Sequence, residues 1–534
     1  MSNREKISLS EMWLKFHPYN NMNPSDYYFL DLCKQVRKMF DKQGNQYFSE
    51  VFDDYELTEL SCMLVCYFED VISQCGIWQA FRKLHYEKYQ KYLPFYELNG
   101  YEPEEINYDD ICFLLWYYQS MKTKGKRIYS PLNTVYIRVA MEVFNLFDIE
   151  FETAPENSKL YAFIKQLPKD PDFYEVRYKI QWLVNSCYLF FYAGETVVDE
   201  LQEFIEENGI DHVSDFSKEL NDGLTFNRHL DLMALRACEW YAHILTKEHP
   251  LFVHILNISE KKSGKFFMQM EDTRNLYFQH IASDTVIAVT KKSLERIKGT
   301  VENETIFHIG FIKWRNEWWF TGSLIAEPFN ADLVLDEKNN IKSRSLFGNT
   351  HENSKYLLEQ YKMFLKFNKK NALAFLSKKQ TIESFMNNFV EFHKTELNIT
   401  PEKEEQSKKR LRKDGFFGPD NNELKFESES YTPKMIWFNP KSGPEVIFGF
   451  NNFINDKENK DYDPNFDSQT GIQLIAHPHI SADFVFFLIE SYHLQNVKFG
   501  NEQTEDHTAM DNLDFLLRFY KNENYHTFQN ITLI

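Results

Sequence analysis

The polar side chains that most resemble a catalytic or metal site lie in the sequence His477-Pro-His479, with Asp483 four residues further on. Imidazoles close to a carboxylate perform acid–base catalysis or bind metal ions. A loop that leads into a helix, with an aspartate in the first helical turn, explains the same residues equally well. We therefore keep His477, His479 and Asp483 as one candidate site, which would make the protein a hydrolase or a transferase.

Three other groups of potential metal ligands have simpler explanations. Cys62 and Cys66 lie four residues apart in an oily helical segment without a second cysteine pair, so core packing explains them better than zinc. The two histidines and two acids within residues 229–243 lack a metalloprotease spacing and fit local ion pairs. The acidic loop 452–470 lacks the glycine and the bidentate glutamate of a calcium loop. We therefore expect no metal and no cofactor.

Known catalytic motifs do not occur in the chain. We find no phosphate-binding glycine loop, dinucleotide fingerprint, serine-hydrolase elbow or kinase set. A catalytic triad assembled from distant residues stays open, because its members need only meet in space. The sequence therefore favours a protein that is not an enzyme.

The segment Gly310–Gly322 is the richest in tryptophan and reads as a β-hairpin. Alternation along its strands predicts that Trp314 and Trp318 share one face and that Trp319 points to the other. At least one indole then faces away from the core of the sheet.

An outward indole has two explanations. It could pack against the neighbouring helical domain, or it could belong to an aromatic contact patch for a peptide, a base or a partner protein. Arg315 and His308 would flank that patch, so Trp314, Arg315, Trp318, Trp319 and His308 form the candidate binding site.

Hydrophobic periodicity predicts a multidomain α+β protein. Residues 1–255 repeat apolar side chains at three- and four-residue steps, which predicts an acidic all-α bundle. Residues 256–345 contain short apolar runs separated by turn residues, which predict a small antiparallel β-barrel or curled sheet. A helical and charged linker segment is expected over 346–429, and a C-terminal α+β domain over 430–534.

Composition and charge restrict the class of protein. The chain has 534 residues, more than one core holds, and 16% are aromatic with only 18 glycines, which argues against disorder. No secretory signal or long apolar run is visible, and the seven cysteines are an odd number, so we expect a cytoplasmic protein with free thiols and no membrane contact. The net charge of −19 comes mainly from the two ends of the chain, so nucleic-acid binding is unlikely for the N-terminal half but stays open for the middle.

Several sequence blocks together resemble one protein family. They are YFEDVISQCGIWQAF (67–81), KYLPFYEL (91–98), DDICFLLWYY (109–118), TAPEN (153–157), WRNEWWFTG (314–322), WFNPKSGPEVIF (437–448) and DNLDFLLRFYKNENYHTFQNITLI (511–534). The chain is similar in these blocks to a family of uncharacterised cytoplasmic proteins, a domain of unknown function from Bacteroidetes-type bacteria. The resemblance spans nearly the whole chain and implies a bacterial cytosolic origin, but no activity, cofactor or catalytic residue.

Three functions follow as hypotheses. We favour a non-catalytic interaction or scaffold protein that binds a protein partner through the tryptophan-rich barrel surface. The alternatives are a nucleic-acid- or ribosome-associated factor, because small barrels present aromatic side chains to bases, and a hydrolase or transferase that uses the C-terminal histidines.

Overall fold

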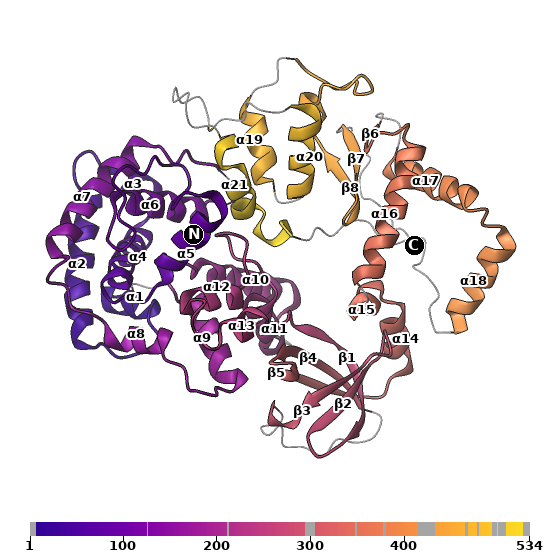
Figure 1. The fold of residues 1–534 in the computed structure, drawn as a ribbon, viewed down its shortest axis with the longest axis horizontal. Helices are drawn as coiled ribbons and strands as arrows, with labels where there is room; N and C mark the ends of the chain where they lie inside the picture. The colour runs from indigo at the N-terminus through magenta and orange to yellow at the C-terminus, as the bar shows by residue number, and fades with distance from the viewer. Residues whose placement is uncertain are drawn as a thin grey trace. The chain divides into compact units, whose positions relative to one another are not determined.

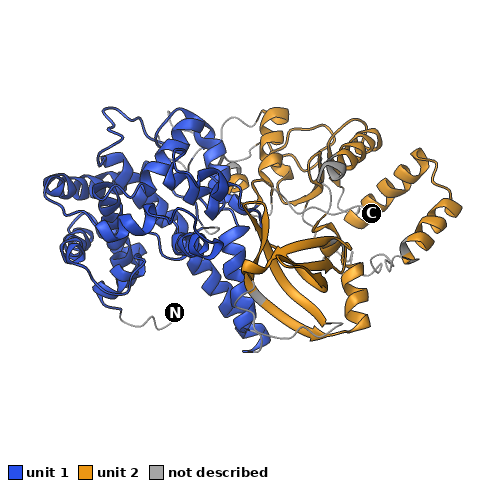
Figure 2. Cartoon of the chain, turned by 60° about the horizontal axis from the view of Figure 1, so that its bottom comes forward, with its two compact units in different colours: residues 1–260, 496–523 blue, residues 261–495, 524–534 orange. Residues whose placement is uncertain are grey.

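The chain folds into two compact units in the computed structural model (Figure 2), which describes residues 7–124, 127–210, 213–293, 305–347, 350–376, 381–413, 433–464, 468–477, 480–493, 499 and 509–526. Unit 1 comprises residues 1–260 and 496–523, and unit 2 comprises residues 261–495 and 524–534. The boundary near residue 260 lies close to the predicted boundary at 255, and the finer predicted boundaries stay predictions.

Unit 1 is helical, as the sequence predicts for this region (Figure 1). Its helices are α1 (Leu9–Lys15), α2 (Pro24–Phe40), α3 (Gln46–Val51), α4 (Asp54–Ile72), α5 (Ile77–Tyr89), α6 (Tyr108–Lys122), α7 (Thr134–Glu150), α8 (Ser158–Lys165), α9 (Phe173–Asn185), α10 (Tyr192–Asn208), α11 (Val213–Phe226), α12 (Ala237–Leu245), α13 (Phe252–Leu256) and α21 (Leu513–Tyr520).

Helix α4 lies at the centre of the unit 1 core. Asp53 and Glu56 form a capping box at its start, each side chain accepting a hydrogen bond from the other's backbone N–H. The apolar face is buried from Leu57 to Phe68, and Val71 and Ile72 at the end of the helix are half-buried. Two acids near its end, Glu69 and Asp70, are buried as well, so they require hydrogen-bond partners inside the unit.

Helix α21 completes the same core although it is distant in sequence. The Phe515 ring is 1% exposed and lies 6.5 Å from the ring of Phe81 and 6.2 Å from that of Phe113, centroid to centroid. Phe519 lies 5.1 Å from Trp116. The sequence analysis left this helix in the segment 430–534, because periodicity shows that a helix is amphipathic but not which core it joins.

Unit 2 begins with a curled five-stranded sheet. Its strands are β1 (Lys262–Glu271), β2 (Asn275–His280), β3 (Val286–Thr290), β4 (Thr305–Trp314) and β5 (Glu317–Pro328), with the short 3-10 helix η1 (Lys291–Ser293) after β3. The pairing follows the order β1-β2-β3-β5-β4 and returns to β1, so the sheet closes on itself. We call it the closed sheet.

The closed sheet is mixed rather than antiparallel throughout, which corrects the predicted pattern. All other neighbours are antiparallel, but β3 and β5 run parallel where Val289 lies opposite Trp318. The sequence shows where strands begin and end, but the direction of a pairing between β3 and β5 depends on the connection through β4. The interior is filled by the buried side chains of Phe266, Phe278, Ile287, Val289, Phe307, Ile309, Phe311 and Phe320.

One place in the closed sheet requires glycine. A Cβ at Gly264 of β1 would lie 2.8 Å from the Nε2 atom of His280 on β2. His280 is fully buried, its Nδ1 lies 2.8 Å from the Ser283 hydroxyl, and the ring of Phe347 packs 5.1 Å from its own. Burial lowers the pKa of His280, against the smaller effects of the Glu337 and Asp284 carboxylates.

The rest of unit 2 has α+β structure, as predicted for the C-terminal part. Its elements are α14 (Ala331–Asn339), α15 (Ile341–Ser345), α16 (Thr350–Phe367), β6 (Leu373–Leu376), α17 (Ile382–Glu396), α18 (Pro401–Lys413), β7 (Lys434–Asn439), β8 (Gly443–Phe448), α19 (Ser468–Ala476) and α20 (Ala482–Tyr492). The predicted hairpin is β7–β8, and β6 adds an antiparallel third strand that the sequence analysis did not identify.

No single helix in the described part of the chain combines the length and the apolar character that crossing a membrane requires. The helices α4 and α5 meet both criteria only as a pair, bent by 82°.

Because the folded-state pKa of His280 lies below its ordinary value of 6.5, the unfolded chain binds more protons as the pH falls through 6.5. We expect the free energy of unfolding to decrease over this range until the lowered pKa is passed. His280→Gln keeps a polar side chain beside Ser283 and does not titrate, so its stability relative to the wild type should rise as the pH falls from 7 to 5. Urea unfolding at several pH values, followed by tryptophan fluorescence, measures the difference, and a difference independent of pH contradicts the prediction.

Candidate functional site

The tryptophan hairpin contributes mainly to packing. Trp314 is 1% and Trp319 5% exposed, while Trp318 is half-buried and packs against the interior of the closed sheet. Arg315 and Asn316 form a two-residue turn, both with positive φ, so Trp314 lies opposite Glu317. Trp314 therefore shares a face with Trp319, not with Trp318 as the alternation predicted, because the turn changes the phase of the alternation.

The two flanking residues of the predicted patch lie apart along the hairpin. The Arg315 guanidinium lies 5.1 Å from the centre of the Trp314 ring at the turn. His308 lies on β4 opposite Lys265 of β1, with Nε2 3.8 Å from a Glu327 oxygen, and burial lowers its pKa. The structure therefore does not gather the five predicted residues into one exposed aromatic surface.

The described residues of the predicted C-terminal site make packing and hydrogen-bond contacts within unit 2. Asp483 lies in the first turn of α20 and accepts hydrogen bonds from Lys441 at 2.6 Å and Asn439 at 3.3 Å, which ties the helix to the β7–β8 hairpin. The His477 ring packs edge-on against Phe450 at 5.4 Å. His479 lies outside the described residues. No hydrogen bond or ion pair between His477 and Asp483 is among the described interactions.

A different surface of the closed sheet carries aromatic and amide side chains. Part of the outward surface of β1, β2 and β3, which we call the open face, is formed by Phe267, Gln269, Met270, Tyr277, Gln279, Val286 and Ala288. Met270 is 56% and Val286 53% exposed, and the others are half-buried or exposed. Gln269 donates a hydrogen bond to Gln279 across the strands, and the Tyr277 hydroxyl donates to Asp272 at 2.8 Å.

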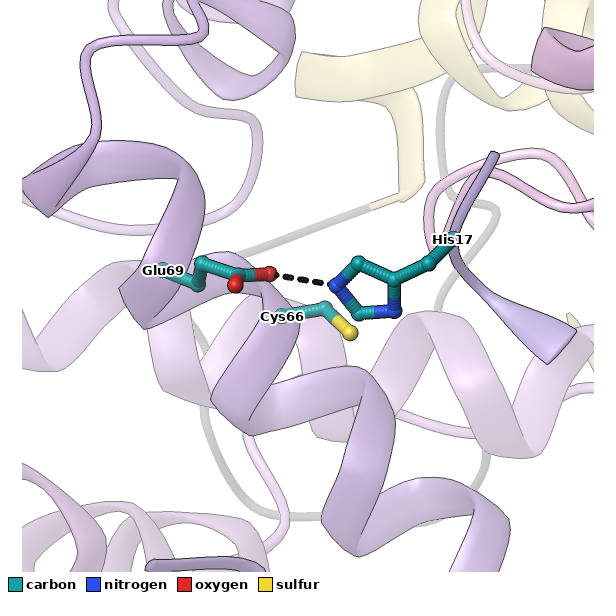
Figure 3. A group of neighbouring side chains, drawn as sticks. All are labelled: His17, Cys66 and Glu69. Carbon is teal, nitrogen blue, oxygen red and sulfur yellow. Dashed lines mark hydrogen bonds and ion pairs between the residues drawn. The ribbon is translucent and has the colours of Figure 1, made fainter. Parts of the chain in front are cut away.

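Unit 1 contains a buried group of three potential metal ligands, His17, Cys66 and Glu69 (Figure 3). Their ligand atoms all lie within 4.8 Å of one another. His17 follows α1 and is 5% exposed, whereas Cys66 and Glu69 lie on neighbouring turns of α4 and are 4% and 0% exposed. The α4 helix places the thiol and the carboxylate on one side because they are three residues apart.

Each member of this group except Cys66 is held by a hydrogen bond from outside it. The His17 Nδ1 donates to the Trp13 carbonyl at 2.8 Å, which leaves Nε2 to contact Glu69 Oε2, also at 2.8 Å. The second Glu69 oxygen accepts from the Asn157 side-chain amide at 2.8 Å. Asn157 in turn caps the start of α8.

The hydrogen bonds continue from Asn157 into a closed circuit. Its amide also donates to the Tyr19 hydroxyl at 2.7 Å, and that hydroxyl donates to Asp26 Oδ1 at 2.8 Å. The Trp13 indole donates to the same oxygen at 3.1 Å, and the Trp13 carbonyl accepts from His17. Four elements of unit 1, α1, α2, α4 and α8, therefore meet in one polar network.

The protonation of this group follows from its burial and charges. Burial disfavours a charged imidazole, but the Glu69 carboxylate outweighs that effect and raises the pKa of His17. Burial and the charge of Glu69 raise the pKa of the Cys66 thiol well above its ordinary value. Both shifts favour the protonated forms of the His17 imidazole and the Cys66 thiol. A thiol in this state is a poor nucleophile.

No sequence motif marks this group. Cys66 has a neighbouring cysteine in Cys62, whereas its companions in the group are Glu69, three residues further along, and His17, far away in the chain. The signal in the sequence is the pair of acids Glu69 and Asp70 within the otherwise apolar run 62–72, because buried acids require partners.

Comparison with known proteins finds a match to a protein family that lies mainly in unit 1. Residues 9–265 match a family model described as a protein of unknown function (DUF3843). No curated protein and no solved structure matches the chain. The match covers the helical unit up to the start of β1, whereas the sequence analysis expected the resemblance to span nearly the whole chain, and the expected bacterial group and compartment stay predictions.

The Asn157 side chain should contribute more stability than an ordinary helix cap, because it also donates a hydrogen bond to the buried Glu69 carboxylate. We expect Asn157→Ala to lower the free energy of unfolding by about 2–4 kcal/mol, from a lost cap and a buried carboxylate oxygen left without its donor. The exposed Asn99 provides the control, and Asn99→Ala should change stability by less than about 0.5 kcal/mol. Chemical denaturation measures both, and equal small effects would show that the circuit does not stabilise unit 1.

Proposed function

We propose that the closed sheet is an OB-like barrel and that it binds single-stranded nucleic acid on its open face. The observation that carries this proposal is the topology. In the OB fold the five strands follow the order 1-2-3-5-4 and return to 1, with strands 3 and 5 parallel, which is the order found here. Function lives in the site and not in the fold, so the side chains must fit the ligand as well.

The first strand supports the OB-like assignment. In this topology strand 1 is long and pairs with two neighbouring strands. Here residues 262–267 of β1 pair with β4 and residues 266–271 pair with β2, with a register shift between Met268 and Met270. Such a bulge bends the strand and increases its twist, which allows one strand to join both sides of a closed sheet. The filled interior leaves the outer surface for a ligand.

The open face fits unpaired bases. Phe267, whose ring stacks on that of the exposed Phe329 with the centroids 6.2 Å apart, and Tyr277 offer aromatic rings, on which bases stack with about 1–3 kcal/mol each. Gln269 and Gln279 offer amides that hydrogen-bond the edges of bases. OB folds bind oligonucleotides with the face of strands 2 and 3 and with the loops between strands 1 and 2 and between strands 4 and 5. Here those loops contain Arg274 and Arg315.

Positive charge gathers around the same part of the chain. Residues 261–328 hold ten lysines and arginines against eight aspartates and glutamates, in a protein with a net charge of −19. Lys291 pairs with Glu271 at 2.8 Å and Lys292 with Glu317 at 3.1 Å. Exposed pairs of this kind are worth about 0–1 kcal/mol, so a phosphate group can replace the carboxylate.

This proposal develops the nucleic-acid alternative of the sequence analysis. The favoured interaction role through a tryptophan-rich surface has less support, because Trp314 and Trp319 are buried. A protein partner for the open face is the competing outcome of the test below.

We expect the full-length protein to bind a fluorescent single-stranded oligonucleotide of about 16 nucleotides at low salt, with affinity falling as salt rises. The double variant Phe267→Ala/Tyr277→Ala should weaken binding about tenfold or more, because two stacking surfaces are lost. Replacing Lys291 and Lys292 by glutamine should make the slope of log affinity against log salt concentration shallower by about one for each lysine, as expected when one phosphate contact is lost. Fluorescence anisotropy measures all three.

The control is Tyr161→Ala, which removes a tyrosine of unit 1 that is 40% exposed and should leave binding unchanged. Circular dichroism establishes that each variant is folded. Absence of binding at low salt, or equal binding by the wild type and the folded double variant, overturns the proposal. Capture of a protein partner that survives nuclease treatment and is lost in the double variant, without oligonucleotide binding, would assign the open face to protein recognition instead.

A further inference from the structure

We propose that His17, Cys66 and Glu69 form a site for one divalent transition metal ion and that zinc is its best occupant. The group combines an imidazole nitrogen, a thiol sulfur and a carboxylate oxygen within 4.8 Å. This mixture of nitrogen, sulfur and oxygen ligands suits zinc, whereas calcium and magnesium take oxygen ligands.

The present distances are close to those of a zinc site. Zinc lies about 2.0–2.1 Å from nitrogen, about 2.3 Å from sulfur and about 2.0–2.2 Å from oxygen, in tetrahedral geometry. Those lengths place the ligand atoms about 3.3–3.7 Å apart. The His17–Glu69 contact at 2.8 Å has to open slightly, and no ligand atom is further than 4.8 Å from another.

The surroundings already orient two of the ligands. A metal-binding imidazole usually donates its other N–H to a carbonyl or a carboxylate, and His17 donates Nδ1 to the Trp13 carbonyl. The Asn157 amide holds Glu69 Oε1 and leaves Oε2 directed at the imidazole. These two hydrogen bonds survive when a metal replaces the proton between His17 and Glu69.

Charge balance suits a divalent ion. A zinc dication bound by one carboxylate, one thiolate and a neutral imidazole leaves the buried site without net charge, and the protons that the ligands lose on binding go to solvent.

The burial of the ligands determines at which stage of folding the metal ion binds. His17, Cys66 and Glu69 are 5%, 4% and 0% exposed, so the ion binds as unit 1 folds. Three protein ligands leave one position of a tetrahedral ion for a water molecule. The site is independent of the open face, which belongs to unit 2.

The test is to unfold the full chain, refold it with zinc chloride, remove free metal and determine the zinc content by mass spectrometry. We expect stoichiometric zinc in the wild type and a loss of at least tenfold in Cys66→Ser. The matched control is Cys62→Ser, a buried cysteine one turn earlier on α4 that is not in the ligand group, and it should retain the metal.

A second measurement tests whether the bound metal ion is coordinated by the Cys66 thiolate. Refolding with cobalt(II) should give the near-ultraviolet thiolate-to-cobalt absorption in the wild type and in Cys62→Ser, but not in Cys66→Ser. A wild type that refolds without zinc and without this absorption overturns the proposal. Equal metal content in wild type and Cys66→Ser overturns it as well, because the ion would then be bound elsewhere.

Discussion

A carboxylate inside an apolar helix bundle has to be neutralised, and this constraint organises unit 1 around Glu69. The side chain is fully buried on α4, where an unpaired charge would cost far more than one hydrogen bond returns. Its two oxygens are satisfied by His17 and Asn157, which lie far apart in the sequence. These contacts hold the segment after α1 and the start of α8 in place against α4. The surrounding apolar side chains provide most of the stabilisation.

The two units use aromatic residues differently. In unit 1, rings such as Phe81, Trp116 and Phe515 meet each other across helices and form a continuous core. In the closed sheet the phenylalanines fill the interior, Trp314 and Trp319 are buried on the other face of the hairpin, and Phe267 and Tyr277 stay on the open face. An abundance of aromatic residues therefore does not indicate a binding surface by itself; the register of the strands decides which rings a ligand reaches.

The sequence predicted what depends on local pattern and missed what depends on distant pairing. The buried face of α4, the β7–β8 hairpin and the change from helices to strands near residue 256 follow from periodicity and turn residues. The side of Trp314 could not be predicted without the two-residue turn, because one residue more or less in the turn reverses the alternation. The grouping of His17 with Glu69, the parallel pairing of β3 with β5 and the place of β6 depend on contacts between segments far apart in the chain. No local pattern encodes such contacts.

The place of α21 in the core of unit 1 has a consequence for how the protein is made. Unit 2 is encoded almost entirely within unit 1, between residues 260 and 496. During synthesis from the N-terminus, the surface that receives Phe515 and Phe519 emerges from the ribosome more than half a chain before those residues do. At about 5–20 residues per second, the helices of unit 1 expose that apolar surface for tens of seconds. A nascent chain of this kind offers a binding site to chaperones during that interval, and helix α21 closes the core only after residues 261–495 of unit 2 have been synthesised.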